Sequence, residues 1–270
     1  MTTDRAVTVQ DLTAMRARGE RIVMVTAYDA GAAALADEAG VPVLLVGDSL
    51  AMVVLGHGTT LPVTLDEMIH HARAVVRGAG RALVVVDLPF GSTQGGPADA
   101  LRSAVRVLKE TGAAAVKLEG GRSVAPTVRT LVEAGIPVMG HVGLTPQSVH
   151  ALGGYRVQGR GAGAADALVA DAVALAEAGA FALVLEAVPS AVGAAVAAAS
   201  PVPVIGIGAG PDVDGQVLVW HDVLGLTSGP TPRFVRTYED LRGRTTAALR
   251  AFADDVRSGA YPGPSESYGE

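Results

Sequence analysis

Short apolar runs alternate regularly along the chain with longer segments rich in Ala and Leu. Eight runs rich in Val, Leu and Ile predict strands at 22–27, 43–47, 82–87, 114–119, 136–140, 182–186, 203–207 and 222–226. Segments with helical spacing predict helices at 30–39, 65–77, 97–111, 123–134, 164–178 and 190–199. Nearly continuous apolar strands indicate a parallel sheet that is covered on both faces. Eight such strands, alternating with helices, therefore favour an α/β fold of the closed (β/α)8 type, the TIM barrel.

The length of the chain agrees with one barrel. Single α/β barrels commonly reach the 270 residues found here. No linker or shift in composition divides the sequence, and residues 238–268 read as a helix and a polar tail added after the eighth strand. We therefore expect residues 1–270 to form one barrel domain with a short N-terminal helix, a C-terminal helix and a tail.

Charge and composition narrow the possible partners. The net charge is -6 and no run of Lys or Arg could follow a phosphate backbone, so nucleic-acid binding is not expected. The absence of cysteine excludes disulfides and a cysteine nucleophile. Charges interrupt the first twenty residues, and prolines break the uncharged stretch after Glu186, so neither a signal peptide nor a membrane span is expected. These features favour a cytoplasmic protein.

Four predicted strands end in, or run directly into, a carboxylate. In VLLVGDSL the acid is Asp48, and the later ones are Asp87, Glu119 and Glu186. With 27 acids in 270 residues, about one would be expected at eight strand ends by chance. The C-terminal ends of barrel strands meet at one rim, so these side chains would share a pocket. Alternatively, each acid caps the helix that follows or faces water.

Clustered carboxylates repel one another, which makes a divalent cation their natural partner. Oxygen ligands favour Mg2+ over zinc. The histidines agree with this preference, because His70 and His71 are adjacent and cannot share a helix face, and no HExxH motif occurs. The sequence therefore predicts a Mg2+ site at the rim.

Two basic side chains are expected beside the acids. Lys117 stands two residues before Glu119, so both leave the same face of a strand. A lysine within an apolar strand requires a counter-charge or an anionic ligand, and a simple pair with Glu119 is one alternative. His141 follows the fifth predicted strand and would face the same rim, either as a buried structural histidine or as a residue supporting the metal ligands.

Longer motifs make the chain similar to a known family. It resembles the ketopantoate hydroxymethyltransferases, also called 3-methyl-2-oxobutanoate hydroxymethyltransferases, over nearly its whole length. The motifs, in chain order, are IVMVTAYD, LLVGDSL, TLPVTLDEM, DLPFGS, AAVKLEGG, GHVGLTPQSV, LVLEAVP, PVIGIGAG and SGAYPG. Two places depart from the family pattern: Thr93 replaces a usual tyrosine, and His57 and Gly58 replace a different pair.

The resemblance implies a fold, a reaction and a set of roles. It implies a barrel of the phosphoenolpyruvate/pyruvate-like group that assembles as a homo-oligomer, commonly a decamer. The implied reaction moves a hydroxymethyl group from 5,10-methylenetetrahydrofolate to 3-methyl-2-oxobutanoate, with Mg2+ stabilising an enolate. By motif, the metal ligands would be Asp48, Asp87 and Glu119. The substrate would contact Ser49 and Lys117 besides Asp48 and Asp87, and Glu186 would be the catalytic base.

Two other functions remain open on the residues alone. A related Mg2+-dependent lyase or mutase acting on 2-oxo acids would use the same rim of acids. A catalytically silent barrel that serves as a scaffold would need none of them. Folate-dependent exchange distinguishes the first alternative, and loss of a rim acid would have favoured the second.

Overall fold

The computed structural model describes residues 5–269, which divide into two compact units. The first extends to Val219 and contains the barrel. The second begins at Trp220 and contains the C-terminal helix.

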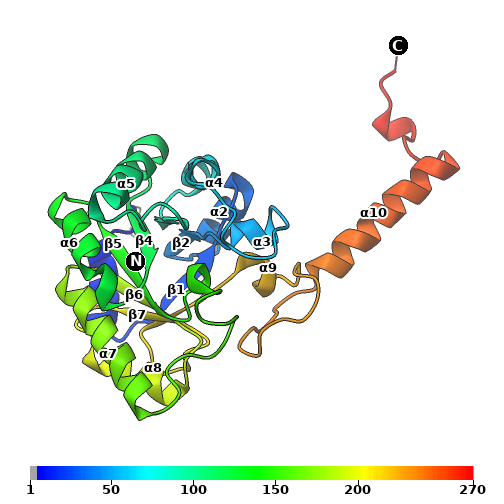
Figure 1. The fold of residues 1–270 in the computed structure, drawn as a ribbon. Helices are drawn as coiled ribbons and strands as arrows, with labels where there is room; N and C mark the ends of the chain where they lie inside the picture. The colour runs from blue at the N-terminus through cyan, green and yellow to red at the C-terminus, as the bar shows by residue number, and fades with distance from the viewer. Residues whose placement is uncertain (1–4, 270) are drawn as a thin grey trace. The chain divides into compact units, whose positions relative to one another are not determined.

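Eight parallel strands close into a barrel in chain order (Figure 1), in which β8 also pairs with β1. This confirms the predicted (β/α)8 fold. The strands are β1 (Ile22–Thr26), β2 (Val43–Val46), β3 (Leu83–Asp87), β4 (Ala115–Glu119), β5 (Val138–Gly143), β6 (Ala182–Glu186), β7 (Val204–Ile207) and β8 (Gly215–Leu218).

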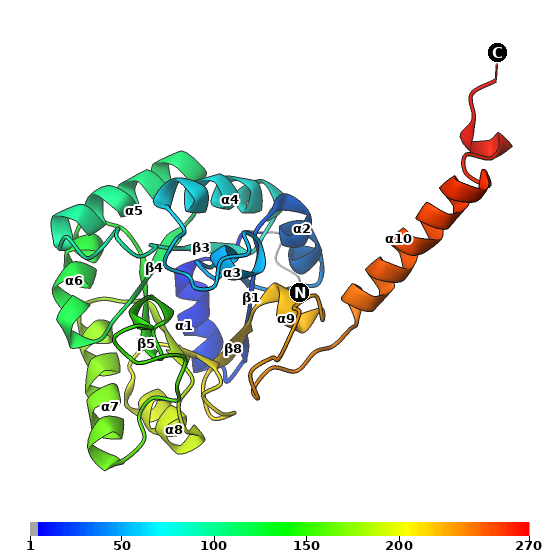
Figure 2. The ribbon, with the colours of Figure 1, turned by 45° about the vertical axis from the view of Figure 1, so that its right-hand side comes forward.

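Helices surround the strands of the first unit (Figures 1 and 2). The longer ones are α1 (Val9–Ala17), α2 (Ala30–Glu38), α4 (Leu65–Gly78), α5 (Pro97–Thr111), α6 (Ala125–Glu133), α7 (Ala162–Glu177) and α8 (Ser190–Ala199). Short elements add α3 (Leu50–Val53) and the 3-10 helices η1 (Arg122–Val124) and η2 (Pro146–Ser148).

Local chemistry sets where the helices begin and end. Before α4, Thr64 and Glu67 form a capping box in which each side chain accepts a hydrogen bond from the other residue's backbone N–H. In α5, Pro97 occupies the first turn, and Gly112 ends the helix at a φ of 81° that glycine adopts without strain. Both helices agree with the sequence prediction to within one residue.

The eighth strand does not lie where the sequence predicted it. Residues 222–226 were expected to be extended, whereas α9 (Trp220–Val223) occupies this part and β8 is earlier. No helix separates β7 from β8, so the strand lacks the spacing that marked the other seven. Close approach also requires Gly215, because a Cβ there would lie 2.3 Å from the carbonyl oxygen of Ile22 on β1.

The barrel interior is apolar toward the end where the strands begin. Leu12 and Met15 of α1 pack there against side chains of several strands, among them Ile22, Leu83 and Met139. Each large side chain buried in this way stabilises the fold by roughly 1.5–3 kcal/mol. Because α1 contributes to the core at this end, the opposite end of the barrel is the one left to carry polar groups.

The second unit contains α9, α10 (Leu241–Ser258) and the 3-10 helix η3 (Pro264–Glu266). Asp240 caps the start of α10 by accepting from the N–H of Gly243 at 2.9 Å. No residue of α10 is buried, although Leu249, Phe252 and Val256 follow one another at helical spacing. Among the described residues, no helix is both long and apolar enough to cross a membrane.

Candidate active site

The acids predicted at the strand ends come together at one end of the barrel. Register explains this, because residues at the same level of neighbouring strands face one another: Asp87 pairs with Lys117 and Glu119 with His141. On the next pair of strands, Glu186 stands opposite Gly143. The structure therefore brings the predicted side chains into one connected set: Asp48, Ser49, Asp87, Lys117, Glu119, His141 and Glu186.

Asp48 and Asp87 are buried beside each other. The backbone N–H of Asp48 donates to Oδ2 of Asp87 at 3.0 Å, and the two residues are only 4% and 3% exposed. Burial raises the pKa of Asp48 well above its usual range, and the negative charges of Asp87 and Glu119 add to that effect. Burial also raises the pKa of Asp87, against the opposing effect of Lys117. Added positive charge would stabilise this pair.

Lys117 supplies one such charge. Its Nζ lies 2.8 Å from Oδ1 of Asp87 and 3.1 Å from Nδ1 of His141. Burial alone would lower the pKa of Lys117, but the three surrounding carboxylates outweigh it and raise the pKa, so the amine is charged. The simple pair with Glu119 considered above is replaced by a pair with Asp87, on the neighbouring strand.

His141 bridges two of the carboxylates. Its Nδ1 lies 3.4 Å from Oε1 of Glu119, and its Nε2 lies 3.3 Å from Oε2 of Glu186. Burial and the charge of Lys117 lower the pKa of His141, yet the two carboxylates raise it overall, to about 9. Depending on its proton, Nδ1 accepts from Lys117 or donates to Glu119. His141 thus connects the predicted metal ligands with the predicted base.

The backbone around Glu186 is held in an uncommon conformation. Ala187, the next residue, has a φ of 49°, which only a few per cent of non-glycine residues adopt. Gly143 of β5, which is paired with Glu186, has a φ of 92°, and a Cβ there would lie 2.3 Å from the carbonyl oxygen of Glu186. Such features persist where the surrounding structure enforces them and are frequent at functional sites.

Two contributing residues were missed by the sequence analysis. Tyr28 follows β1, is 3% exposed, and its hydroxyl lies 2.9 Å from Oγ of Ser49. Gln147 follows β5, is 7% exposed, and contacts both Asp48 and Glu119. An aromatic residue directly after a strand, as in IVMVTAYD, could have pointed to Tyr28. No comparable strand-end signal marks Gln147, which lies in the short 3-10 helix η2.

The donor groups suit Mg2+ in kind. Buried carboxylates around one lysine leave an excess of negative charge, and oxygen donors are those that Mg2+ prefers. Within residues 5–269, however, no three acidic or histidine side chains form a ready-made metal cage. Mg2+ generally takes one or two carboxylates and completes its shell with water and substrate, so the site fits an ion of that kind.

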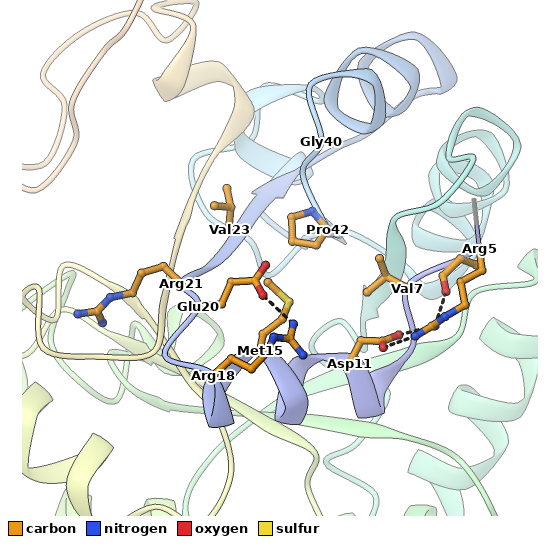
Figure 3. A pocket seen from close by; sticks show the side chains of 11 residues that line it. Arg5, Val7, Asp11, Met15, Arg18, Glu20, Arg21, Val23, Gly40 and Pro42 are labelled. Atoms are coloured by element: carbon orange, nitrogen blue, oxygen red, sulfur yellow. Dashed lines mark hydrogen bonds and ion pairs between the residues drawn. The ribbon is translucent and has the colours of Figure 1, made fainter. Parts of the chain in front are cut away.

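A cavity of about 320 Å³ lies away from this site, between α1, the start of β1 and the loop before β2 (Figure 3). Met15, Val23 and Pro42 form its apolar part. Two of the three arginines at its border pair with neighbouring acids, Arg5 with Asp11 at 2.6 Å and Arg18 with Glu20 at 2.6 Å, and the third, Arg21, donates to the carbonyl oxygen of Val213. Most of its charged groups are therefore already paired, and it contains none of the acids from the strand ends.

Comparison with known proteins gives a consistent result. The family model described as ketopantoate hydroxymethyltransferase matches residues 6–264. A 3-methyl-2-oxobutanoate hydroxymethyltransferase of Frankia alni is 59% identical over 261 residues, covering 97% of this chain and 86% of the relative. One from Moorella thermoacetica is also 59% identical, over 262 residues that cover 97% of each chain.

Solved structures share the fold at much lower identity. Phosphonopyruvate hydrolase in complex with oxalate and Mg++ superposes with a TM-score of 0.63 at 17% identity, covering 96% of this chain and 93% of the other. A putative phosphonomutase from Burkholderia cenocepacia superposes with a TM-score of 0.59 at 18% identity, covering 93% of this chain and 99% of the other. These similarities support the barrel fold.

Proposed function

The chain belongs to the ketopantoate hydroxymethyltransferase family, and from that membership we propose how its strand ends carry out the reaction. It is a hydroxymethyltransferase of pantothenate biosynthesis, acting on the small oxo acid for which its relatives are named. A lyase or mutase and a silent scaffold are disfavoured, because the relatives that share over half of its residues are transferases.

Our proposal gives the acids two roles. Asp48, Asp87 and Glu119 would hold Mg2+, which when bound stabilises negative charge on substrate oxygens as a Lewis acid. The neighbouring phosphonopyruvate hydrolase structure contains Mg++ with the small dianion oxalate, which agrees with such a site. Ser49 and Lys117 would bind the carboxylate of 3-methyl-2-oxobutanoate, supported by the charge on Lys117 and by the hydroxyl contact that orients Ser49.

Glu186 would remove the proton from C3 of the substrate. Its side chain is 17% exposed, whereas those of Asp87 and Glu119 are each 4% exposed, so it is the more accessible to a bound molecule. His141, 3.3 Å from Oε2, orients the Glu186 carboxylate. Loss of the C3 proton leaves an enolate, whose negative charge is stabilised by the preorganised positive charge of the site.

The enolate carbon then forms a bond to the one-carbon unit of 5,10-methylenetetrahydrofolate. Overall, the two carbon–nitrogen bonds of that unit break, one water supplies the hydroxyl group, and the products are 2-dehydropantoate and tetrahydrofolate. We propose this donor from the family resemblance. A cytoplasmic location and the absence of nucleic-acid partners are likewise proposals.

One observation supports these roles above all: Asp87, Lys117, His141 and Glu186 form an unbroken series of contacts across four strands. The direct test is turnover of 3-methyl-2-oxobutanoate with 5,10-methylenetetrahydrofolate and Mg2+, with 2-dehydropantoate measured by mass spectrometry. We expect product only when all three are present. Product formed at the same rate without folate would exclude the proposed donor.

We also propose that the chain forms a homo-oligomer, a decamer by resemblance. The second unit supports association, because Leu249, Phe252 and Val256 of α10 are 63%, 53% and 48% exposed on one helix face. A stripe of this kind normally packs against another surface. A second copy of the chain is the partner that the family resemblance suggests.

A further inference from the structure

Gln147 contacts two of the proposed metal ligands at once. Its side-chain Nε2 donates to Oδ2 of Asp48 at 2.8 Å and to the carbonyl oxygen of Leu88 at 3.0 Å. Its backbone N–H donates to Oε2 of Glu119 at 2.9 Å. One residue of η2, which follows β5, therefore binds the carboxylate that comes just after β2 and the one that ends β4.

The chemistry of these contacts fixes the orientation of the amide. Both acceptors are oxygens, one of a carboxylate and one of a backbone carbonyl, so only the NH2 group of Gln147 can face them. The reversed amide would place its own oxygen against two others. The two N–H bonds of Nε2 are thus both used, and the side chain is 7% exposed, which restricts it to this arrangement.

A neutral donor is the appropriate group at this position. A lysine or arginine here would add a second buried cation and compete with a metal ion for the acids. A glutamate would add another negative charge beside Asp48, whose pKa is already raised by burial and by its neighbours. An amide can hold a carboxylate oxygen while leaving its charge available to a cation.

We propose that Gln147 is a positioning residue that holds the Asp48 and Glu119 carboxylates in the orientation in which they receive the divalent cation. This inference rests on the proposed function, which assigns these two acids to the metal. Each carboxylate is bound through one oxygen by Gln147, so its rotation is restricted before the ion arrives. Partners of metal ligands commonly contribute about 10- to 100-fold to metal affinity or activity.

The test compares Gln147→Met with the wild-type chain. Methionine has a similar length and no polar hydrogen, and the backbone N–H to Glu119 is kept. Mg2+ affinity is measured by titration calorimetry on metal-free full-length protein. The Mg2+ dependence of turnover is measured in parallel. We expect about 10- to 100-fold weaker binding, a matching rise in the Mg2+ concentration for half-maximal activity, and a kcat that largely recovers at saturating Mg2+.

A matched control is Gln158→Met, in the same connection between β5 and α7. The Nε2 of Gln158 donates to the carbonyl oxygen of Arg156 and contacts no acid of the site. The Gln158→Met variant should bind Mg2+ as the wild type does. If Gln147→Met does not fold, Gln147→Asn serves instead, because it stays polar but is too short by one methylene to reach Asp48. Gln147→Asn should show the same loss of Mg2+ affinity as Gln147→Met.

The outcomes separate the two proposals. Wild-type protein that binds no Mg2+ and turns over without it would overturn the metal assignment, and this inference with it. Wild-type binding together with unchanged affinity in folded Gln147→Met or Gln147→Asn would overturn the role of Gln147 alone. A fall in kcat that saturating Mg2+ does not restore, with affinity unchanged, would also overturn it.

Discussion

The Nζ of Lys117 lies 2.8 Å from Oδ1 of Asp87, and each side chain is only 4% exposed. Removing one partner of such a pair leaves the other charge buried without compensation. We predict that Lys117→Met lowers the free energy of unfolding of the metal-free chain by about 3–5 kcal/mol. Equilibrium unfolding in urea measures the change.

The chain offers a matched control in its only other lysine. Lys109 lies on the exposed surface of α5, so Lys109→Met should change the free energy of unfolding by less than about 0.5 kcal/mol. An equal effect of the two substitutions would show that the buried pair does not stabilise the fold.

Glu186→Gln separates the proposed base from the metal ligands. If Glu186 takes the C3 proton, wild-type enzyme with Mg2+ but no folate should exchange that hydrogen with deuterium from solvent. The substitution keeps the shape of the side chain but removes its basicity, so exchange should fall by roughly 10²- to 10⁴-fold. Proton NMR of 3-methyl-2-oxobutanoate follows the exchange.

Mg2+ binding should survive in Glu186→Gln, and Glu177→Gln, at the exposed end of α7, should exchange at the wild-type rate. Loss of Mg2+ binding would identify Glu186 as a ligand. Unchanged exchange would assign the removal of the C3 proton to another group, such as His141, whose Nε2 lies 3.3 Å from Oε2 of Glu186.

Metal removal should abolish turnover. Chelation with EDTA is expected to stop product formation and added Mg2+ to restore it, because the buried acids around the substrate need a neutralising cation. Asp48→Asn and Asp87→Asn should each raise the Mg2+ requirement or eliminate activity. Full turnover in metal-free buffer would exclude this role.

The cap of α1 should make stability depend on pH. Arg5 and two hydrogen bonds from Thr8 hold the pKa of Asp11 well below its usual range (Figure 3 shows the ion pair). A lowered folded-state pKa stabilises the protein above the usual value of about 4, and this contribution is lost as the pH falls below it. Solvent screens the group, so Asp11→Asn should cost no more than about 1 kcal/mol at pH 7.

Thermal unfolding of Asp11→Asn and wild type at pH 7 and pH 3 tests this, with the difference expected to shrink at pH 3. The control is Asp254→Asn, whose pair with Arg257 is exposed on both sides and should contribute nothing measurable. If the difference in stability between wild type and Asp11→Asn grew toward pH 3, the prediction would be contradicted.

Association should depend on the apolar stripe of α10. Phe252→Asp places a charge in the middle of the stripe and should shift the oligomer toward smaller species in light scattering. Arg250→Asp adds the same side chain on the opposite face of the helix and should leave the mass unchanged. A wild-type monomer of 27.2 kDa at micromolar concentration would contradict the proposed assembly.

Seven strands and the meeting of their acids could be predicted because both follow from patterns along the chain. Apolar runs of strand length mark β1 to β7, and a parallel barrel brings all their ends to one rim. The eighth strand could not be found in this way. It pairs through Gly215 and follows β7 without a helix, so neither periodicity nor spacing distinguishes it from a loop.

The contacts within the site were predictable only in part. Lys117 and Glu119 share a strand face, as the period of two requires, but the partner of Lys117 is Asp87 because the register between β3 and β4 decides which side chains meet. Register is a property of the closed barrel rather than of either strand. Gln147 reaches Asp48 from a residue 99 positions away, which no local pattern encodes.

The series of contacts from Asp48 through Asp87, Lys117 and His141 to Glu186 also determines how the energies of its members combine. Groups that share partners do not contribute independently, and interaction energies of about 0.5–3 kcal/mol are usual for residues in one network. Single substitutions at these positions therefore measure the cost of disturbing the whole set. Only double-mutant cycles, for example Lys117→Met with Asp87→Asn, will apportion that cost between two neighbours, and their summed single effects should exceed the effect of the pair.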